Sequence, residues 1–557
     1  MDKEAMTRYQ SWINDPSISQ KDKDMLATMD QAELQDAFYK DLEFGTAGMR
    51  GVMGLGANRM NFYTVGRATQ ALANYINNTV SSGQSVAISY DTRHFSKEFA
   101  RQSAQILAAN GIKVYLFDDF RPTPVLSFTV RYFKATAGIM ITASHNPPQY
   151  NGYKAYWSNG AQVIPPHDEG ITREYEAIRS FGEIQSMPLE EAQQKGLVVM
   201  IGSEVDEAYF KKALSYSFGI HSKDLSIVYT PLHGTGIKIV PILLQRDGFD
   251  FYSQKEQSIP DGNFPTVNYP NPELDDAFRL SIADAQRRGA DIIVASDPDA
   301  DRMGVFVRHD GNYVRVDGNQ MGALLLHFML EMYSRNGMPE HPAVIESIVS
   351  SKLFAKIAAS YGVEVSEVLT GFKWICNEAD DLRSKGKNVF FAYEESYGYS
   401  VGDFVYDKDS GTPIMMTCEM ATYYKQKGMT LVDALEELYK KYGYYLEDQL
   451  SPVFEGEAGV AKIQGIMREL REHPVKALGG HELTTIIDYA KGYGHLPPSD
   501  VLKMEFGDKL LIYARPSGTE PKVKFYFMIM NMENRTAAQT LLAKVKTEFS
   551  ELLDSIE

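Results

Sequence analysis

Short apolar runs alternate along this chain with loops rich in glycine, proline and polar residues. The runs are five or six residues long, which is typical of β-strands, and apolar residues at helical spacing follow several of them. We predict helices over residues 320–332 and 537–553 and across most of the first forty residues. We predict strands over residues 85–90, 138–142, 225–229, 291–295, 342–346, 388–393 and 509–514. Strands and helices that alternate in this way indicate an α/β protein.

One order of elements recurs along the chain. The runs 85–90, 225–229 and 342–346 each lead into a loop and then into a helical pattern, which predicts three related α/β domains. The 557 residues also exceed what one hydrophobic core organises, so we expect three or four domains in all. We place them at residues 1–205, 206–315, 316–445 and 446–557.

Charge and cysteine content narrow the class of protein. The 56 lysines and arginines face 73 aspartates and glutamates, a net charge of −17, which disfavours binding to nucleic acid or to an anionic membrane. Two cysteines, Cys376 and Cys418, are too few for a disulfide framework or a cysteine zinc site. No apolar run is long enough to span a membrane or to form the core of a signal peptide. We therefore expect a cytoplasmic enzyme; the sequence leaves its oligomeric state open.

Three carboxylates at alternate positions follow the predicted strand 291–295. Asp297, Asp299 and Asp301 would lie on a loop at the carboxyl end of that strand, where open α/β sheets bind ligands. Three hard oxygen ligands suit Mg²⁺, and the loop lacks the glycine that an EF-hand has at its sixth position. An acidic loop in solvent is the alternative. The strict alternation behind a buried strand favours the metal site.

A serine follows the predicted strand 138–142. Two prolines stop any regular continuation, so we expect Ser144 to be exposed at the end of that strand. No G-x-S-x-G pattern surrounds it, which disfavours acyl transfer. A phosphoserine would carry about −1.5 to −2 charges at neutral pH and would need a divalent cation and basic neighbours. His145 and Lys154 lie close by in sequence, while a turn or helix-capping serine is the alternative.

These stretches resemble motifs of the α-D-phosphohexomutase superfamily. Residues 142–147 match its catalytic serine loop and residues 297–302 match its metal loop. Two more motifs follow in the family's order, because residues 394–398 resemble its sugar-binding loop and residues 515–521 its phosphate-binding loop. The resemblance extends from about residue 41 to about residue 530. It implies three related α/β domains and a smaller C-terminal α+β domain around a central cleft.

The resemblance also implies roles for individual residues. It implies Mg²⁺ bound by Ser144, Asp297, Asp299 and Asp301. It implies a catalytic set of Ser144, His145, Arg50, Lys154 and Lys408. It implies substrate binding by Arg302, Lys373, Glu394, Ser396, Arg515, Ser517, Gly518 and Thr519.

Four residues of the surrounding segments can also be interpreted from the sequence around them. Arg50 lies among the glycines of residues 45–51, where the backbone can approach a ligand while the guanidinium binds it. We expect Lys373 to lie on a loop. For Lys408, the alternative to a catalytic role is an exposed charged turn. For His233 we predict a role in structuring its loop, because no metal or acidic partner lies at a useful spacing.

The activity that the resemblance implies is that of a phosphoglucomutase. Phosphorylated Ser144 would convert glucose 1-phosphate and glucose 6-phosphate into each other through glucose 1,6-bisphosphate, which is both intermediate and activator. Phosphomannomutase or phosphopentomutase activity is the alternative within the class, so the expected partners are small sugar phosphates. A Mg²⁺-dependent phosphatase and an inactive sugar-phosphate binding protein are alternatives from other classes. The phosphate-binding loop argues against the first and the intact Ser144 against the second.

Overall fold

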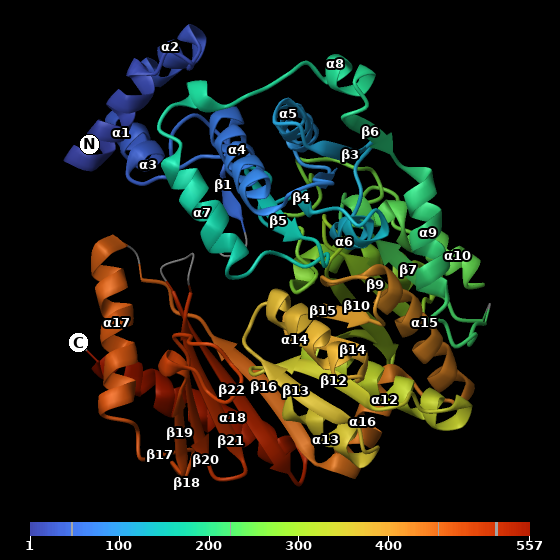
Figure 1. Cartoon of the computed structure of the whole chain (residues 1–557). Coiled ribbons are helices and arrows are strands. Elements are labelled where there is room, and N and C mark those ends of the chain that lie inside the picture. Colours follow the sequence, from blue (N-terminus) through green and yellow to red (C-terminus); the bar gives the residue numbers. More distant parts are fainter. Residues whose placement is uncertain (46–47, 223, 455, 518–521, 557) are drawn as a thin grey trace. The chain divides into compact units, whose positions relative to one another are not determined.

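The computed structural model describes residues 1–45, 48–222, 224–454, 456–517 and 522–556. They form two compact units (Figure 1). The first comprises residues 1–315 and 397–423, and the second comprises residues 316–396 and 424–557. Among the described residues, no helix combines the length and apolar character that crossing a bilayer requires.

The N-terminal residues form a small helical cluster, as predicted. It consists of α1 (Lys3–Asn14), α2 (Gln20–Thr28) and α3 (Gln31–Phe38). Each helix has an N-cap side chain that accepts a backbone hydrogen bond, which satisfies donors that a helix start otherwise leaves unpaired. Trp12 packs edge-on against Phe38 and Phe181, with ring centroids 5.5 and 5.1 Å away. The contact with Phe38 lies within the cluster, and the contact with Phe181 attaches the cluster to the following domain.

A six-stranded sheet follows in the order β1-β5-β4-β2-β3-β6. Strands β2, β3, β4 and β6 run parallel, while β5 runs antiparallel to both β4 and β1. The strands are β1 (Met49–Val52), β2 (Ser85–Tyr90), β3 (Lys113–Phe117), β4 (Ala137–Ile141), β5 (Tyr150–Trp157) and β6 (Val198–Ile201). The helices are α4 (Phe62–Thr79), α5 (Ser96–Ala109), α6 (Thr123–Tyr132), α7 (His167–Ala177) and α8 (Leu189–Gln194).

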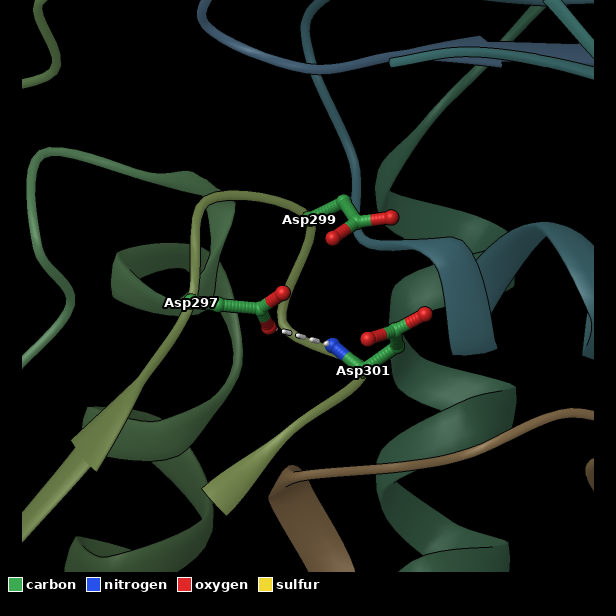
Figure 2. Close-up of side chains that lie close together, drawn as sticks. All are labelled: Asp297, Asp299 and Asp301. Carbon is green, nitrogen blue, oxygen red and sulfur yellow. Dashed lines mark hydrogen bonds between the residues drawn. The ribbon is translucent and has the colours of Figure 1, made fainter. Parts of the chain in front are cut away.

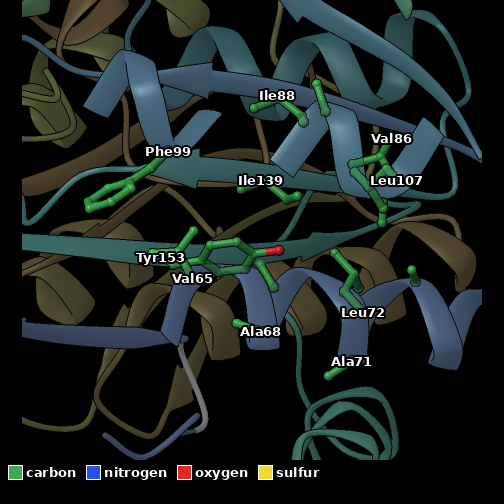
Figure 3. Close-up of a cluster of buried hydrophobic side chains, with 14 of the residues drawn as sticks. Val65, Ala68, Ala71, Leu72, Val86, Ile88, Phe99, Leu107, Ile139 and Tyr153 are labelled. Carbon is green, nitrogen blue, oxygen red and sulfur yellow. The ribbon is translucent and has the colours of Figure 1, made fainter. Parts of the chain in front are cut away.

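The core of this sheet combines the apolar runs 85–90 and 138–142, which the sequence analysis predicted as strands, with apolar residues of α4, which it did not predict. Val65 and Leu72 of α4 pack in one buried cluster with Val86 and Ile88 of β2 and Ile139 of β4 (Figure 3). All five side chains are completely buried. Parallel strands covered by helices need apolar residues on both faces, which explains the nearly continuous apolar runs in the sequence.

A second sheet in the first unit has the order β11-β10-β9-β7-β8. Strands β7, β8 and β9 run parallel, and β10 returns antiparallel to β9. The strands are β7 (Ile227–Thr230), β8 (Phe251–Ser253), β9 (Ile292–Ser296), β10 (Met303–His309) and β11 (Asn312–Val316). The helices are α9 (Ser203–Leu214), α10 (Val240–Arg246) and α11 (Arg279–Arg288). The later segment of this unit contains β15 (Gly398–Val401) and most of α15 (Gly411–Gln426).

The described part of the second unit contains a parallel sheet, a five-stranded antiparallel sheet and a short two-stranded antiparallel pair. In the parallel sheet, β12 (Pro342–Ser347) lies between β13 (Glu364–Val368) and β14 (Asn388–Glu394). The accompanying helices are α12 (Gly318–Asn336), α13 (Lys352–Ser360), α14 (Phe372–Ser384) and α16 (Leu431–Tyr442). This arrangement repeats the strand, loop and helix order of the two sheets before it.

The antiparallel sheet has the order β16-β22-β21-β20-β19. Its strands are β16 (Tyr444–Leu450), β19 (Thr485–Asp488), β20 (Leu502–Phe506), β21 (Leu510–Pro516) and β22 (Val523–Met532). The other elements of this region are α17 (Gly456–Glu472), α18 (Arg535–Ser555) and the short strands β17 (Ala477–Leu478) and β18 (His481–Glu482). Three α/β sheets followed by an α+β region confirm the predicted fold class. The exact domain boundaries stay a prediction.

A buried acidic pair ties α15 to the rest of the first unit. Glu419 accepts two backbone hydrogen bonds, of 3.0 and 3.1 Å. The hydroxyl of Ser217 lies 2.7 Å from a carboxylate oxygen of Glu419 and 2.7 Å from one of Asp247. One hydroxyl donates only one proton, so this arrangement favours a proton retained on the carboxylates. Burial and then the charge of Asp247 raise the pKa of Glu419 to about 7, and burial raises the pKa of Asp247 to about 6.

Replacing Glu419 by glutamine is expected to flatten the pH dependence of stability. The folded-state pKa lies above the ordinary value of 4.5, so the stabilisation is complete below about pH 4.5 and is lost as the pH rises through about 7. Glutamine keeps the shape of the protonated carboxyl and does not titrate. Thermal midpoints measured between about pH 5 and pH 8 should fall less steeply for Glu419→Gln than for wild type. The exposed control Glu190→Gln should follow wild type, and equal slopes for Glu419→Gln and wild type would contradict the assignment.

Candidate active site

The serine predicted as nucleophile lies in the loop between β4 and β5. Ser144 has a left-handed backbone, with φ of 51°, and its N–H donates to Thr142 Oγ1 at 2.8 Å. Contrary to the prediction of an exposed serine, its relative exposure is only 4%. The prediction was wrong because loops from other parts of the unit cover this strand end. The left-handed conformation is strained for a residue other than glycine. It is typically found in functional loops, where contacts with the surrounding structure enforce it.

Arg93 supports this loop from behind, and the sequence analysis did not identify it. Its guanidinium donates to the carbonyl oxygens of Ser144 (2.6 Å), Pro147 (2.8 Å) and Tyr150 (3.1 Å). Its Nε lies 3.2 Å from Asp91 Oδ2, and both side chains are completely buried. A signal was present in the sequence, because an aspartate and an arginine two residues apart directly follow the apolar run 85–90.

The three aspartates form one buried cluster in the loop between β9 and β10 (Figure 2). Their ligand oxygens lie within 4.8 Å of one another, and the side chains are at most 2% exposed. Asp297 Oδ1 accepts the backbone N–H groups of Asp301 and Arg302, both at 3.0 Å. The alternative of an acidic loop in solvent is therefore wrong.

One buried oxygen of each aspartate has no hydrogen-bond donor among the described residues. These atoms are Asp297 Oδ2, Asp299 Oδ1 and Asp301 Oδ1. Burial, followed by repulsion from Asp299 and Asp301, raises the pKa of Asp297 well above its ordinary value. Buried carboxylate oxygens without donors are costly, and a divalent cation satisfies all three at once. Three carboxylate oxygens are ligands that suit Mg²⁺.

Cationic side chains converge on the same cluster. Ser144 Oγ donates to Asp299 Oδ2 at 3.2 Å, and Lys154 Nζ donates to the same oxygen at 2.8 Å. Arg50 Nη2 lies 3.5 Å from Ser144 Oγ. Burial lowers the pKa of Lys154, but the charges of Asp299 and Asp301 outweigh it and leave the pKa above its ordinary value. The serine, Arg50 and Lys154 are thus brought together with the aspartates, as predicted.

Lys408 is buried in the same cluster, so the alternative of an exposed turn is wrong. Its Nζ lies 3.2 Å from Asp301 Oδ2 and 3.4 Å from Asp407 Oδ1. The hydroxyl of Tyr156 donates to the other oxygen of Asp407 at 2.7 Å. Burial raises the pKa of Asp301, but Lys408 and then Lys154 outweigh it and hold that pKa below its ordinary value.

Glycines allow the strand that carries Arg50 to approach the serine loop. Arg50 of β1 pairs with Gly152 of β5. A Cβ on Gly152 would lie 2.4 Å from the carbonyl oxygen of Thr142, and one on Gly48 would lie 1.9 Å from that of Tyr153. Any larger residue at either position would push β1 or β5 away from the site.

Two histidines have different surroundings. His145, beside the serine, is half-buried, and burial followed by the charges of Arg302 and Arg50 lowers its pKa well below the ordinary value. The ring of His233 lies 2.9 Å from the carbonyl oxygen of Ile259 through Nδ1 and 2.9 Å from the hydroxyl of Thr266 through Nε2. The prediction that His233 structures its loop is confirmed.

Arg302, predicted to bind substrate, pairs with Glu273 and belongs to the first unit. The other predicted substrate residues belong to the second unit. Glu394 ends β14, and Ser396 Oγ donates to its Oε1 at 3.0 Å. Lys373 was predicted on a loop, which is wrong, because it lies in the first turn of α14. Gly371, with φ of 110°, ends the preceding loop, and its carbonyl oxygen accepts the Trp374 N–H at 2.9 Å.

The predicted phosphate-binding residues lie at the end of β21. Arg515 pairs with Lys524 of β22, and its guanidinium donates to Thr370 Oγ1. The N–H of Ser517 donates to the carbonyl oxygen of Lys522 at 2.8 Å. Gly518 and Thr519 lie outside the described residues. The contact with Thr370 brings Arg515 close to the start of α14, the helix that carries Lys373.

Known proteins resemble this chain over most of its length. Family models described as phosphoglucomutase/phosphomannomutase α/β/α domains I, II and III match residues 41–181, 207–311 and 317–442. The phosphoglucomutase of Staphylococcus saprophyticus is 37% identical over 521 residues, which cover 91% of this chain and 94% of that protein.

Solved structures show the same fold. The Paramecium phosphoprotein pp63/parafusin, a phosphoglucomutase in its open form, matches with a TM-score of 0.70 and 17% identity over 93% of this chain and 95% of its own. The N-acetylphosphoglucosamine mutase of Aspergillus fumigatus, solved with GlcNAc-6P and magnesium, matches with a TM-score of 0.54 and 14% identity over 100% of both chains.

Arg93→Leu is expected to destabilise the first unit and to slow its chemistry. The substitution leaves the buried carboxylate of Asp91 without its cation and the carbonyl oxygens of the serine loop without donors. Breaking a buried ion pair in this way costs about 3 to 5 kcal/mol of unfolding free energy. Calorimetry should show a lower thermal midpoint, while the exposed control Arg101→Leu should melt as wild type does. A wild-type midpoint for Arg93→Leu would mean that this arginine does not support the loop.

Proposed function

This chain belongs to the phosphoglucomutase/phosphomannomutase family, and from that premise we propose that it interconverts glucose 1-phosphate and glucose 6-phosphate. Such an enzyme is an isomerase that transfers a phosphoryl group within one molecule. The observation that carries the proposal is the hydrogen bond of 3.2 Å between Ser144 and Asp299. It links the nucleophile of the predicted reaction to the carboxylates of the predicted metal site. We assign glucose as the sugar from the phosphoglucomutase relatives. Other small sugar phosphates would present the same hydroxyl and phosphate groups to this site.

The aspartate cluster is the proposed Mg²⁺ site. Asp297, Asp299 and Asp301 would hold the ion through their unsatisfied oxygens, and the oxygen of Ser144 or its phosphoryl group would be a further ligand. When bound, the ion compensates the negative charge on the phosphoryl group during transfer. The magnesium in the Aspergillus mutase supports this choice of metal.

The proposed reaction begins with phosphorylated Ser144. A hydroxyl oxygen of the bound sugar phosphate forms a bond to phosphorus while the bond from Ser144 Oγ to phosphorus breaks. The product is glucose 1,6-bisphosphate. The bisphosphate then turns, and its other phosphoryl group returns to the serine by the reverse step. Arg50 and Lys154, which reach Ser144 and Asp299 respectively, stabilise the charge that moves between these oxygens.

The hydroxyl that attacks the phosphoryl group must lose a proton. His145 stands beside the serine, where a ring nitrogen could take part in moving that proton. Lys408 pairs with Asp301 and Asp407, which favours its cationic form and suits it to stabilise charge or to return a proton. We therefore propose that His145 or Lys408 moves this proton during the transfer.

The remaining predicted residues have proposed roles in holding the substrate. The carboxylate of Glu394 and the hydroxyl of Ser396 would accept and donate hydrogen bonds to neighbouring sugar hydroxyls. The phosphate that is not transferred would be bound by Arg515, Ser517, Gly518, Thr519 and Lys373, with Arg302 as a further substrate contact. A second phosphate site distinguishes a mutase from a phosphatase, because it can bind the phosphate that is not being transferred in each of the two orientations of the bisphosphate.

Ser144→Ala is expected to abolish mutase activity with the fold retained. The substitution removes only the oxygen that carries the phosphoryl group. The conversion of glucose 1-phosphate to glucose 6-phosphate, measured with a coupled dehydrogenase, should fall to background, and the wild-type phosphoserine should be absent by mass spectrometry. The exposed Ser158→Ala is the control and should retain full activity. Turnover of Ser144→Ala near the wild-type rate would overturn the assignment of the nucleophile.

Arg515→Ala is expected to raise KM for glucose 1-phosphate by about 10- to 100-fold. Each hydrogen bond to a charged group is worth about 1.5 to 3 kcal/mol, and this arginine would bind the phosphate throughout the reaction. The variant should also depend more strongly on added glucose 1,6-bisphosphate, because the intermediate escapes more readily. Initial rates at several bisphosphate concentrations test both effects, with the exposed Arg468→Ala as control. Unchanged rate curves, together with release of inorganic phosphate, would favour the phosphatase alternative.

A further inference from the structure

We infer that Thr123 is a positioning residue that orients the carboxylate of Asp299 for the metal. The inference rests on the metal site proposed above. Thr123 lies outside every motif that the sequence analysis identified. Its side chain and that of Asp299 are both completely buried, and 176 residues separate them in the chain. The fold alone brings them together.

Thr123 contacts Asp299 at two points. Its hydroxyl donates to Asp299 Oδ2 at 2.9 Å, and its backbone N–H donates to the carbonyl oxygen of Asp299 at 2.9 Å. One contact fixes the backbone of the metal loop and the other fixes the rotation of the carboxylate. Together they leave Asp299 Oδ1 as the oxygen without a donor among the described residues.

The two oxygens of Asp299 therefore have separate tasks. Oδ2 accepts from Thr123 (2.9 Å), from Lys154 (2.8 Å) and from Ser144 (3.2 Å). In the phosphorylated enzyme Ser144 has no hydroxyl proton to donate, and Lys154 lies where it would also meet the phosphoryl charge. Thr123 is the one donor of these three that takes no part in the transfer. It can hold the carboxylate in one orientation through both half-reactions.

The start of helix α6 makes Thr123 available for this role. Thr123 is the first residue of that helix, between Pro122 and Pro124, and prolines have no N–H to donate. The Thr123 N–H is one of the donors that a helix start leaves unpaired, and Asp299 satisfies it.

Arg121, two residues before Thr123, anchors this helix start. The carbonyl oxygen of Arg121 accepts a hydrogen bond from Ser89 Oγ at 2.9 Å. The Nε of the Arg121 side chain donates to Asp206 Oδ1 at 2.8 Å. The contacts of Arg121 thus fix the start of the helix that carries Thr123, and Thr123 in turn fixes Asp299. A side chain that supports a metal ligand in this way typically contributes 10- to 100-fold to metal affinity or activity.

The experiment measures the binding of Mn²⁺, as a probe of the Mg²⁺ site, to the full-length protein without substrate. Electron paramagnetic resonance reports the free ion. Thr123→Val removes the hydroxyl at nearly constant shape, and the dissociation constant should rise by about 10-fold or more. Thr123→Ala should show a similar loss, and Thr123→Ser, which retains the hydroxyl, should bind nearly as wild type does. Thr129→Val is the matched control, because Thr129 is buried in the same helix and its hydroxyl donates to the carbonyl oxygen of Val125.

Several outcomes separate the inference from the proposed function. Equal affinities for wild type, Thr123→Val and Thr123→Ala would overturn the role of Thr123 while leaving the metal site intact. Weakening by Thr129→Val to the same extent would assign the effect to general loosening of α6 and would also overturn it. If wild type and Asp299→Ala bound Mn²⁺ equally weakly, the proposed metal site itself would fail. A rescue by Thr123→Ser, alongside weak binding by Thr123→Val, supports the inference.

Discussion

The central constraint on the first unit is the burial of three carboxylates within 4.8 Å of one another. Taking one such charge out of water costs several kcal/mol unless cations and hydrogen bonds compensate it. Lys154 and Lys408 reach this cluster from separate parts of the chain, and a divalent cation would complete the compensation. The stability of the folded site and its proposed role in phosphoryl transfer therefore depend on the same balance of charge.

Loops from several strands maintain that balance by fixing one another. Thr235 donates through both its N–H (2.7 Å) and its hydroxyl (2.9 Å) to the carbonyl oxygen of Pro298, and Ser410 donates to that of Ala300. A Cβ on Gly234 would lie 2.3 Å from Pro298, so the loop after β7 can pack against the metal loop only with glycine there. These neighbours hold the backbone of the residues between the aspartates, which fixes the shape of the loop that carries the three carboxylates.

The burial of Ser144 bears on the type of reaction that this site supports. A phosphoserine that water reaches easily is hydrolysed, which is the outcome of a phosphatase. Ser144 is only 4% exposed, in a loop that Arg93 holds in place, and in the proposed reaction this burial would favour transfer to a bound hydroxyl over transfer to water. The same loop keeps Ser144 in a left-handed conformation, directed at Asp299.

Local sequence was enough to predict the elements and the chemistry that lies within single loops. Apolar runs predicted strands such as β9 and β14 to within one or two residues, because burial on both faces demands apolar side chains. The aspartates were found because they are neighbours in sequence.

The sequence analysis did not assign a role to Arg93 or Thr123. It predicted that Ser144 is exposed and that Lys373 lies on a loop rather than in a helix. Those features depend on contacts between segments 51 to 176 residues apart, or on where a neighbouring turn allows a helix to begin, and only the packed tertiary structure decides them.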